Sequence, residues 1–294
     1  MSQMNKAENK HGTGGVKSPL DLRDHKYHKT PIGMSSIPFD WKLGYNVEQD
    51  LATYLNRPNF KLPVKNQNGS GSCGGQAFAT YESVQDAFEK GTFTEKSAKD
   101  IYSQVYVQGG GSTGRDLCRL LVNQGACKES LIVSYSQGQP PSESFMELRE
   151  QTTQSISNAL TAKGQRYATV LKDIDLLAQT VRDNKGLILG VDGANNGTWL
   201  SPFPAPPQQV EWRHWLYCGG AQTINGVKYL KVLNSWGSTV GTAGWQWLGE
   251  SYLPHFFEAW TLYDGLPQTN PQVINLLQQL LALYQQLVLK LKGR

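Results

Sequence analysis

The sequence has few of the features that would indicate a membrane-spanning segment, a metal site or a disulfide-stabilised domain. Its 294 residues include only four cysteines, and no two of them have the close spacing of a zinc site. No run of about 18 consecutive apolar residues occurs, so no membrane-spanning helix is expected. The first 30 residues are polar and lack the apolar core of a secretory signal. We therefore expect no metal or other cofactor, and a cytoplasmic protein or one that is virion-associated or released by a non-classical route.

The sequence also has only a small excess of positive over negative charge. Lysine and arginine total 28 and aspartate and glutamate total 24, which gives a net charge of +4. This excess is too small and too dispersed to predict a nucleic-acid partner. A content of 39% hydrophobic and 18% charged residues is ordinary for a globular protein with one large domain or two lobes. Without an export signal we expect mostly reduced thiols, and a Cys118–Cys127 disulfide is the alternative.

The two halves of the chain have different patterns. Apolar residues at helical spacing predict helices in the first half at 73–90, from Thr94 to about 108, at about 115–124 and at 142–163. The second half predicts strands at 167–171, 186–191 and 244–249, a helix at 174–182, and a hairpin at 214–237 around Asn225-Gly226. The pattern predicts an α+β fold with two lobes, one helical and one an antiparallel sheet, and an active cleft between them.

One cysteine stands in an unusual setting. In "QNGSGSCGGQAFA", Cys73 follows a run of small residues and precedes two glycines at the start of a predicted helix. Such a position predicts an exposed thiol whose pKa the helix N-terminus lowers. Downstream, His214 and Asn234 lie on the two strands of the predicted hairpin. A thiol nucleophile needs a base of this kind and a group that orients it, and Gln67 could donate its amide to an oxyanion.

These residues resemble the papain-like cysteine peptidases over roughly residues 37–264. "VKNQ" (64–67), "GSC" (71–73) and "NSWG" (234–237) match the motifs of that family, as does the order Cys, His, Asn. The resemblance implies catalysis by Cys73, His214, Asn234 and Gln67. It also implies that Gly109, Gly110 and Gly111 in their loop, and Trp236, bind substrate, and that Trp236 shields the His–Asn hydrogen bond.

The sequence departs from the family pattern around the nucleophile. Gly74 replaces an aromatic residue, and Ser70 replaces a cysteine that the family uses in a disulfide. We interpret Gly74 and Gly75 as allowing a substrate backbone to come close, the alternative being that they only bend the chain. The missing disulfide makes the chain more similar to prokaryotic or phage relatives.

The hairpin sets a geometric condition on this constellation. With a two-residue turn at Asn225-Gly226 and regular pairing, His214 and Asn234 would lie on opposite faces of the sheet. We therefore expect a bulge in the first strand, and Gly219-Gly220 is the place for it.

The resemblance predicts an endopeptidase that cleaves peptide or protein substrates through a thioester at Cys73, with His214 as base and acid. Two alternatives remain open. The domain could be an inactive papain-like module used for binding or structure, or an acyl transferase that uses the same residues.

Two segments flank the predicted peptidase domain of residues 37–264. Residues 1–36 read as an N-terminal arm or short pro-segment. Residues 265–294 read as a linker and an amphipathic helix whose apolar stripe is too wide for a solvated helix. We expect this helix to mediate self-association, partner docking or contact with a membrane surface.

Overall fold

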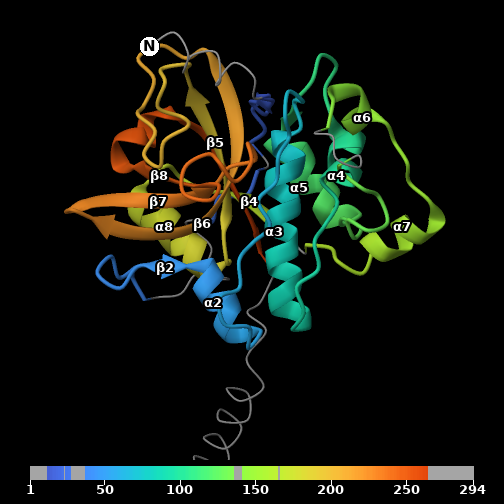
Figure 1. Cartoon of the computed structure of the whole chain (residues 1–294), viewed down its shortest axis with the longest axis horizontal. Coiled ribbons are helices and arrows are strands. Elements are labelled where there is room, and N and C mark those ends of the chain that lie inside the picture. The colour runs from blue at the N-terminus through green and yellow to red at the C-terminus, as the bar shows by residue number, and fades with distance from the viewer. Residues whose placement is uncertain (1–11, 23, 28–36, 136–140, 165, 264–294) are drawn as a thin grey trace, which may run out of the picture.

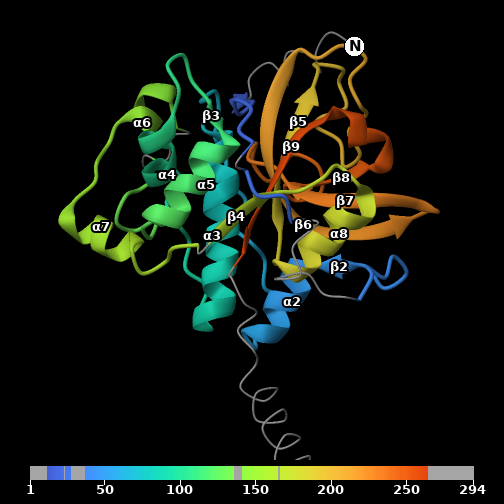
Figure 2. The same cartoon turned by 180° about the vertical axis from the view of Figure 1, so that it is seen from behind.

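The computed structural model describes residues 12–22, 24–27, 37–135, 141–164 and 166–263. Helices form one side of the molecule and a sheet the other, with the helix α3 (Cys73–Lys90) between them (Figures 1 and 2). The expected α+β fold with a helical lobe and an antiparallel sheet lobe is confirmed. The expected helix at the C-terminus lies outside the described residues. Within the described part of the chain, no helix is long and apolar enough to cross a membrane.

The sheet of the second lobe is antiparallel throughout and has the strand order β4-β9-β5-β6-β7-β8, with β2 added against β6. The strands of this sheet are β2 (Tyr45–Asn46), β4 (Arg166–Thr169), β5 (Leu187–Gly193), β6 (Trp212–Ile224), β7 (Val227–Leu233), β8 (Trp245–Gly249) and β9 (Phe256–Tyr263). The helix α8 (Ile174–Asp183) and the 3₁₀ helix η2 (Glu250–His255) belong to the same lobe. The sequence pattern did not predict β2 and β9, because β2 is only two residues long and polar residues interrupt the apolar run of β9.

The helical lobe consists of α3, α4 (Ala98–Val105), α5 (Gly114–Asn123), α6 (Glu143–Glu147) and α7 (Thr153–Ala159). The helix α2 (Val47–Tyr54) packs beside the C-terminal end of α3. The second helix begins at Ala98 and not at Thr94, because the Ser97 hydroxyl caps it by accepting from the Asp100 amide.

The prediction of one helix over 142–163 is wrong. The chain forms α6 and α7 instead, because Leu148 is extended and a capping box between Thr152 and Ser155 starts a new helix. The break allows Glu150 to pair with Lys99 and Gln151 to bond to Asp100 on α4.

The helix α3 is almost entirely buried and joins the two lobes. Its Tyr81 hydroxyl donates to the Leu262 carbonyl on β9 at 3.0 Å. Its two glycines permit close packing inside the protein: a Cβ on Gly74 would lie 2.3 Å from the Ser112 hydroxyl oxygen, and one on Gly75 would lie 2.7 Å from the Ala98 carbonyl oxygen. The expectation that these glycines make room for a substrate is therefore wrong, since protein atoms fill that space.

The hairpin of β6 and β7 contains the expected irregularity. The pairing of Ile224 with Val227 continues in register to Gly220 and Lys231, and it then shifts so that Cys218 lies opposite Val232. Gly219 is the extra residue of the resulting bulge. Beyond the bulge the register brings Asn234 to the face of the sheet that carries His214, so the predicted bulge at Gly219-Gly220 is confirmed.

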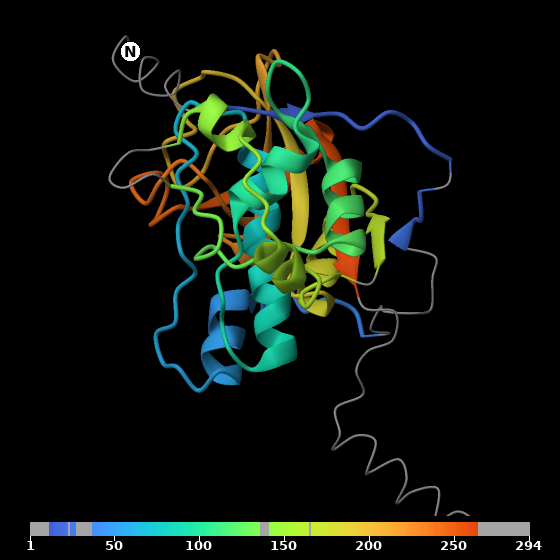
Figure 3. The same cartoon turned by 90° about the vertical axis from the view of Figure 1, so that its right-hand side faces the viewer.

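The described residues of the N-terminal segment, 12–22 and 24–27 (hereafter the arm), pack along both lobes. The strand β1 (Gly15–Val16) pairs in parallel with β3 (Ser112–Thr113) ahead of α5. The arm then runs down the side of the molecule to β4, as the dark blue trace of Figure 3 shows. There the backbone amide of Thr169 donates to the His25 carbonyl, and Tyr27 is buried in the core of the sheet lobe.

Candidate active site

Cys73 is the first residue of α3, and the loop before it is fixed to the loop that follows β7. The backbone amide of Gln67 donates to the Ser235 carbonyl at 2.8 Å, and the backbone amide of Gly237 donates to the Lys65 carbonyl at 3.0 Å. These bonds hold the segment before the cysteine against the segment after Asn234. Residues about 170 positions apart in sequence thus meet where the two lobes join.

His214 and Asn234 are bonded to each other. The Nε2 atom of His214 lies 3.0 Å from the Oδ1 atom of Asn234, and both side chains are buried. The Trp236 ring covers the imidazole at a centroid distance of 4.9 Å. A covering ring of this kind keeps water from the His–Asn bond, and the bond fixes the orientation of the imidazole.

The sulfur of Cys73 lies beside the same strand. It accepts hydrogen bonds from the backbone amides of Trp215, next to His214 on β6, and of Gly14 on the arm. The structure therefore brings Cys73, His214 and Asn234 to one place. The four cysteines, all described, are free thiols, so the alternative of a Cys118–Cys127 disulfide is wrong.

The expectation of an exposed, acidified thiol is wrong for this arm-bound structure. Cys73 is 0% exposed. Burial raises the pKa of the Cys73 thiol to about 12, and the amide hydrogen bonds offset only part of that rise. The arm contributes to this burial, since its Gly14 touches the sulfur.

The side-chain amide of Gln67 is occupied by the arm and by its own loop. The Gln67 side chain donates to the Gly12 carbonyl at 2.9 Å and to the Ser70 carbonyl at 2.8 Å, and it accepts from the Ser235 hydroxyl at 2.6 Å. Trp236 also donates to the Gly12 carbonyl, at 3.1 Å. One carbonyl of the arm thus sits at the place where an oxyanion would be stabilised.

The glycine loop touches the arm at one end only. The Ser112 amide donates to the Gly14 carbonyl at 2.9 Å, and a Cβ on Gly111 would lie 2.6 Å from the same oxygen. A Cβ on Gly109 would meet nothing within 4 Å, and one on Gly110 would meet only the Glu143 carboxylate. Of the three predicted substrate-binding glycines, Gly111 is the one at which an added Cβ would meet the arm.

The arm fits over the site because it presents glycines there. A Cβ on Gly12 would lie 1.9 Å from the Ser70 carbonyl oxygen, and one on Gly14 would lie 1.9 Å from the Gly71 carbonyl oxygen. Both distances are far shorter than any van der Waals contact allows. A longer side chain at either position would force the arm off the site.

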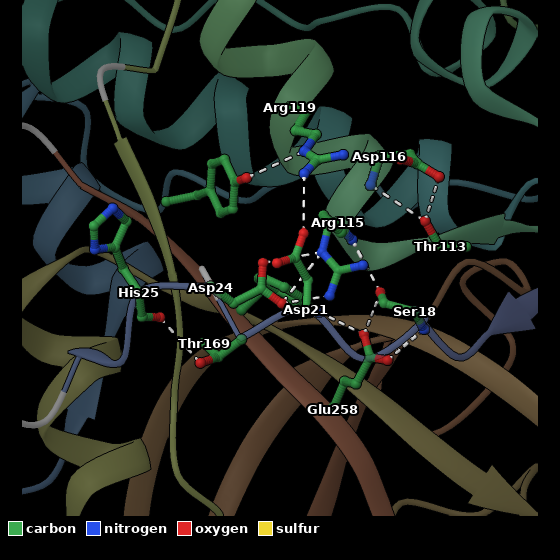
Figure 4. Close-up of polar contacts among 12 residues, drawn as sticks. Ser18, Asp21, Asp24, His25, Thr113, Arg115, Asp116, Arg119, Thr169 and Glu258 are labelled. Atoms are coloured by element: carbon green, nitrogen blue, oxygen red, sulfur yellow. Dashed lines mark hydrogen bonds and ion pairs between the residues drawn. The ribbon is translucent and has the colours of Figure 1, made fainter.

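Beyond the glycines, polar contacts fasten the arm to both lobes (Figure 4). Arg115 of α5 makes a forked ion pair with Asp24, in which Nε lies 2.9 Å from Oδ1, and Asp24 raises the pKa of the guanidinium. The Ser18 hydroxyl donates to Glu258 of β9 at 2.9 Å and accepts from the Arg115 amide at 3.2 Å. These contacts form a latch of Ser18, Asp24, Arg115 and Glu258.

The sequence did not indicate two polar side chains at the site. Gln246 of β8 accepts from the Asn234 amide at 2.8 Å. Glu143 of α6 accepts from the Gly71 amide in the loop before Cys73 and from the Tyr102 hydroxyl of α4. A glutamine on a strand and a glutamate at a helix start give no local signal of function. Only the fold brings them here.

The fold with Cys73 at the start of a central helix, facing a His–Asn pair on the sheet, is the fold of the papain-like cysteine proteases. Among solved structures, the chain is similar to xylellain, a cysteine protease from Xylella fastidiosa, at a TM-score of 0.67 and 21% identity over 86% of this chain and 96% of that one. It is similar to a stem bromelain precursor at a TM-score of 0.63 and 18% identity, over 90% of this chain and 80% of that one.

It is also similar to procathepsin L 3 of the Tenebrio molitor larval midgut, at a TM-score of 0.60 and 17% identity, over 90% of this chain and 79% of that one. At these identities the likeness shows a shared fold. No protein-family model matches the sequence, and no curated protein matches it.

Proposed function

We propose that this protein is a cysteine endopeptidase. Two neighbouring contacts carry the proposal. His214 of β6 bonds to Asn234 at 3.0 Å, and the backbone amide of Trp215, the next residue of β6, bonds to the Cys73 sulfur. A thiol, an imidazole and an amide that orients the imidazole are the parts that nucleophilic catalysis on a peptide bond needs. The fold shared with cysteine proteases supports the same chemistry.

In the proposed reaction, His214 takes the proton of the Cys73 thiol as the sulfur attacks the substrate carbonyl carbon. The oxyanion accepts hydrogen bonds from the Gln67 amide and the Cys73 backbone amide. When the C–N bond breaks, His214 returns the proton to the leaving amine. Water then hydrolyses the thioester, which releases the acid product and restores the thiol.

We also propose that residues 1–36 are an inhibitory pro-segment of the peptidase domain 37–264. The arm places the N–H of Gly14 against the sulfur, and its Gly12 carbonyl accepts from the Gln67 side-chain amide. This arrangement occupies both the proposed nucleophile and the proposed oxyanion donor. The names of two similar structures, a procathepsin and a bromelain precursor, describe proenzymes.

The test is hydrolysis of casein by the full chain with Gly14→Ala, which displaces the arm, with and without Cys73→Ala. We expect the Gly14→Ala chain to cleave casein and the double variant to lose at least about 10⁴-fold in rate. Comparable rates in the two would refute the proposed nucleophile. A stable, folded Gly14→Ala chain with no cleavage and a slowly reacting Cys73 would instead favour the inactive-module alternative. Release of an acyl product onto an added amine would favour acyl transfer.

A further inference from the structure

The amide of Asn234 is held at both ends by buried side chains. Its Oδ1 atom faces Nε2 of His214 at 3.0 Å, and its Nδ2 atom donates to Oε1 of Gln246 at 2.8 Å. His214 and Gln246 are 0% exposed and Asn234 is 1% exposed, so solvent does not compete for these contacts. Gln246 lies on β8, whereas His214 lies on β6 and Asn234 directly follows β7.

The opposite end of Gln246 is fixed by backbone carbonyls. Its Nε2 atom donates to the Trp199 carbonyl at 2.7 Å and to the Ser201 carbonyl at 2.9 Å. A carbonyl oxygen can only accept a hydrogen bond, so both of these contacts require the amino end of the Gln246 amide. The oxygen of Gln246 is therefore the atom that faces Asn234.

This polarity continues toward the imidazole. Because the Gln246 oxygen can only accept, Asn234 must turn its amino group to it and its own oxygen to His214. A ring nitrogen that faces an acceptor must carry a proton, and the hydrogen bond at one ring nitrogen sets the tautomer of the whole ring. The chain of donors and acceptors thus begins at two backbone carbonyls and ends at Nε2 of His214.

We infer that Gln246 is a positioning residue that holds the Asn234 amide in one orientation and thereby keeps the proton of neutral His214 on Nε2. The lone pair is then on Nδ1, the ring nitrogen that Asn234 does not bind. The consequence for catalysis rests on the proposed function, in which this nitrogen takes the Cys73 proton. A flipped Asn234 would present its amino group to the ring, favour the other tautomer and leave the base without a lone pair where it is needed.

The loop that anchors Gln246 is itself part of the shield around His214. The Trp199 ring lies 5.8 Å from the Trp236 ring, which covers His214. The Trp247 amide of β8 donates to the Pro202 carbonyl at 2.8 Å, which fixes the loop beside Gln246. The carbonyls that orient Gln246 are therefore held in place independently of Gln246.

The first measurement uses the wild-type full chain, in which burial keeps Cys73 in the thiol form. Nitrogen-15 NMR of labelled histidine at about pH 8 reads the tautomer of the neutral rings. The chain has five histidines, and His214→Gln assigns the signal. We expect the Nε2–H tautomer for His214, and the Nδ1–H tautomer would overturn the inference even if no variant folds.

The second measurement compares Gln246→Met with Gln85→Met, a control on α3 whose amide also donates to a backbone carbonyl, that of Leu262 at 3.0 Å. We expect Gln246→Met to speed solvent exchange of the Nε2 proton about tenfold. In chains that also carry Gly14→Ala, it should lower kcat about tenfold with KM within about twofold. The control should change neither quantity.

The outcomes separate this inference from the proposed function. A wild-type Nε2–H tautomer with faster exchange in Gln246→Met supports the inference, even if the Gly14→Ala chain cleaves no peptide and the proposed function fails. Unchanged proton exchange and unchanged kcat in a folded Gln246→Met chain would overturn the inference while the proposed function stands.

Discussion

The two sides of the candidate site differ in what their polar side chains bind. On the sheet side, His214, Asn234 and Gln246 bind one another and the backbone of their own lobe. On the helix side, the Cys73 sulfur and the Gln67 amide both bind the arm. The bonds that run from Gln246 through Asn234 to His214 thus involve no residue of the arm, whereas the thiol and the Gln67 amide on the helix side both bind it. A peptide that enters the site has to replace contacts of the helix side and none of those that orient His214.

The largest effect of breaking this difference is expected at the Cys73 thiol. With the arm in place its pKa is raised to about 12, so at neutral pH the thiol form dominates and thiolate appears only as the pH rises. Gly14→Ala should displace the arm and lower the pKa of Cys73 toward its ordinary value. Since each pKa unit is tenfold in thiolate, alkylation by iodoacetamide near neutral pH should speed up about 10³-fold.

Mass-spectrometric mapping of the alkylated residue checks this prediction. Gly164→Ala is the matched control, because a Cβ there meets nothing closer than 3.8 Å. Cys218 is buried, burial raises the pKa of its thiol, and it should stay unreactive in both chains. Equally slow alkylation of Cys73 in a folded Gly14→Ala chain would show that the arm does not control the thiol.

The next effect concerns the oxyanion donor on the helix side. In a chain with Gly14→Ala, adding Gln67→Ala should lower kcat about 10²-fold, because it removes a hydrogen bond that strengthens in the transition state. Gln85→Ala removes a half-buried glutamine of α3 that donates to the Leu262 carbonyl, and it should leave kcat unchanged. A loss of kcat below about threefold for Gln67→Ala would mean that this amide serves only to bind the arm.

The difference between the two sides also explains what the sequence could predict. Cys73 and Asn234 were found because they lie in local motifs, and His214 because it lies on the hairpin strand that pairs with the one before Asn234. The bulge at Gly219 followed from requiring that His214 and Asn234 share a face. The α+β class followed from the change of hydrophobic period along the chain. These predictions needed only local spacing and the geometry of one hairpin.

What the sequence did not predict depends on contacts between distant segments. The pKa of Cys73 rises because the fold and the arm bury it, and a sequence motif carries no information about burial. Gln246 acquires a role only because β8 pairs with β7, and the arm crosses the site only because Gly12 and Gly14 fit against backbone carbonyls. Capping likewise decided the split between α6 and α7, where apolar spacing suggested one helix.

A smaller effect is expected from the latch that fastens the arm. Asp24→Asn keeps the shape of the side chain but removes the charge that pairs with Arg115. The weaker latch should raise the basal rate of casein cleavage about tenfold, which corresponds to about 1.4 kcal/mol of arm binding. Asp175→Asn breaks an ion pair with Lys228 away from the arm and should leave the basal rate as it is. If Asp24→Asn does not change the basal rate, the close fit of the glycines, and not the ion pair, keeps the arm bound.

The smallest effect tests whether the latch acts as one unit. Ser18→Ala removes the hydroxyl that donates to Glu258 and accepts from the Arg115 backbone amide. Both contacts are only partly buried, so the loss should raise the basal rate about threefold. Thr53→Ala removes a hydroxyl bonded to the Gln49 carbonyl on α2 and is the control. Ser18 and Asp24 both bind Arg115, so the double variant should gain less than the product of the single gains, since losing one contact already loosens the residue that the other holds. A double variant whose gain equals that product would mean that the two contacts hold separate stretches of the arm, and that Arg115 does not couple them.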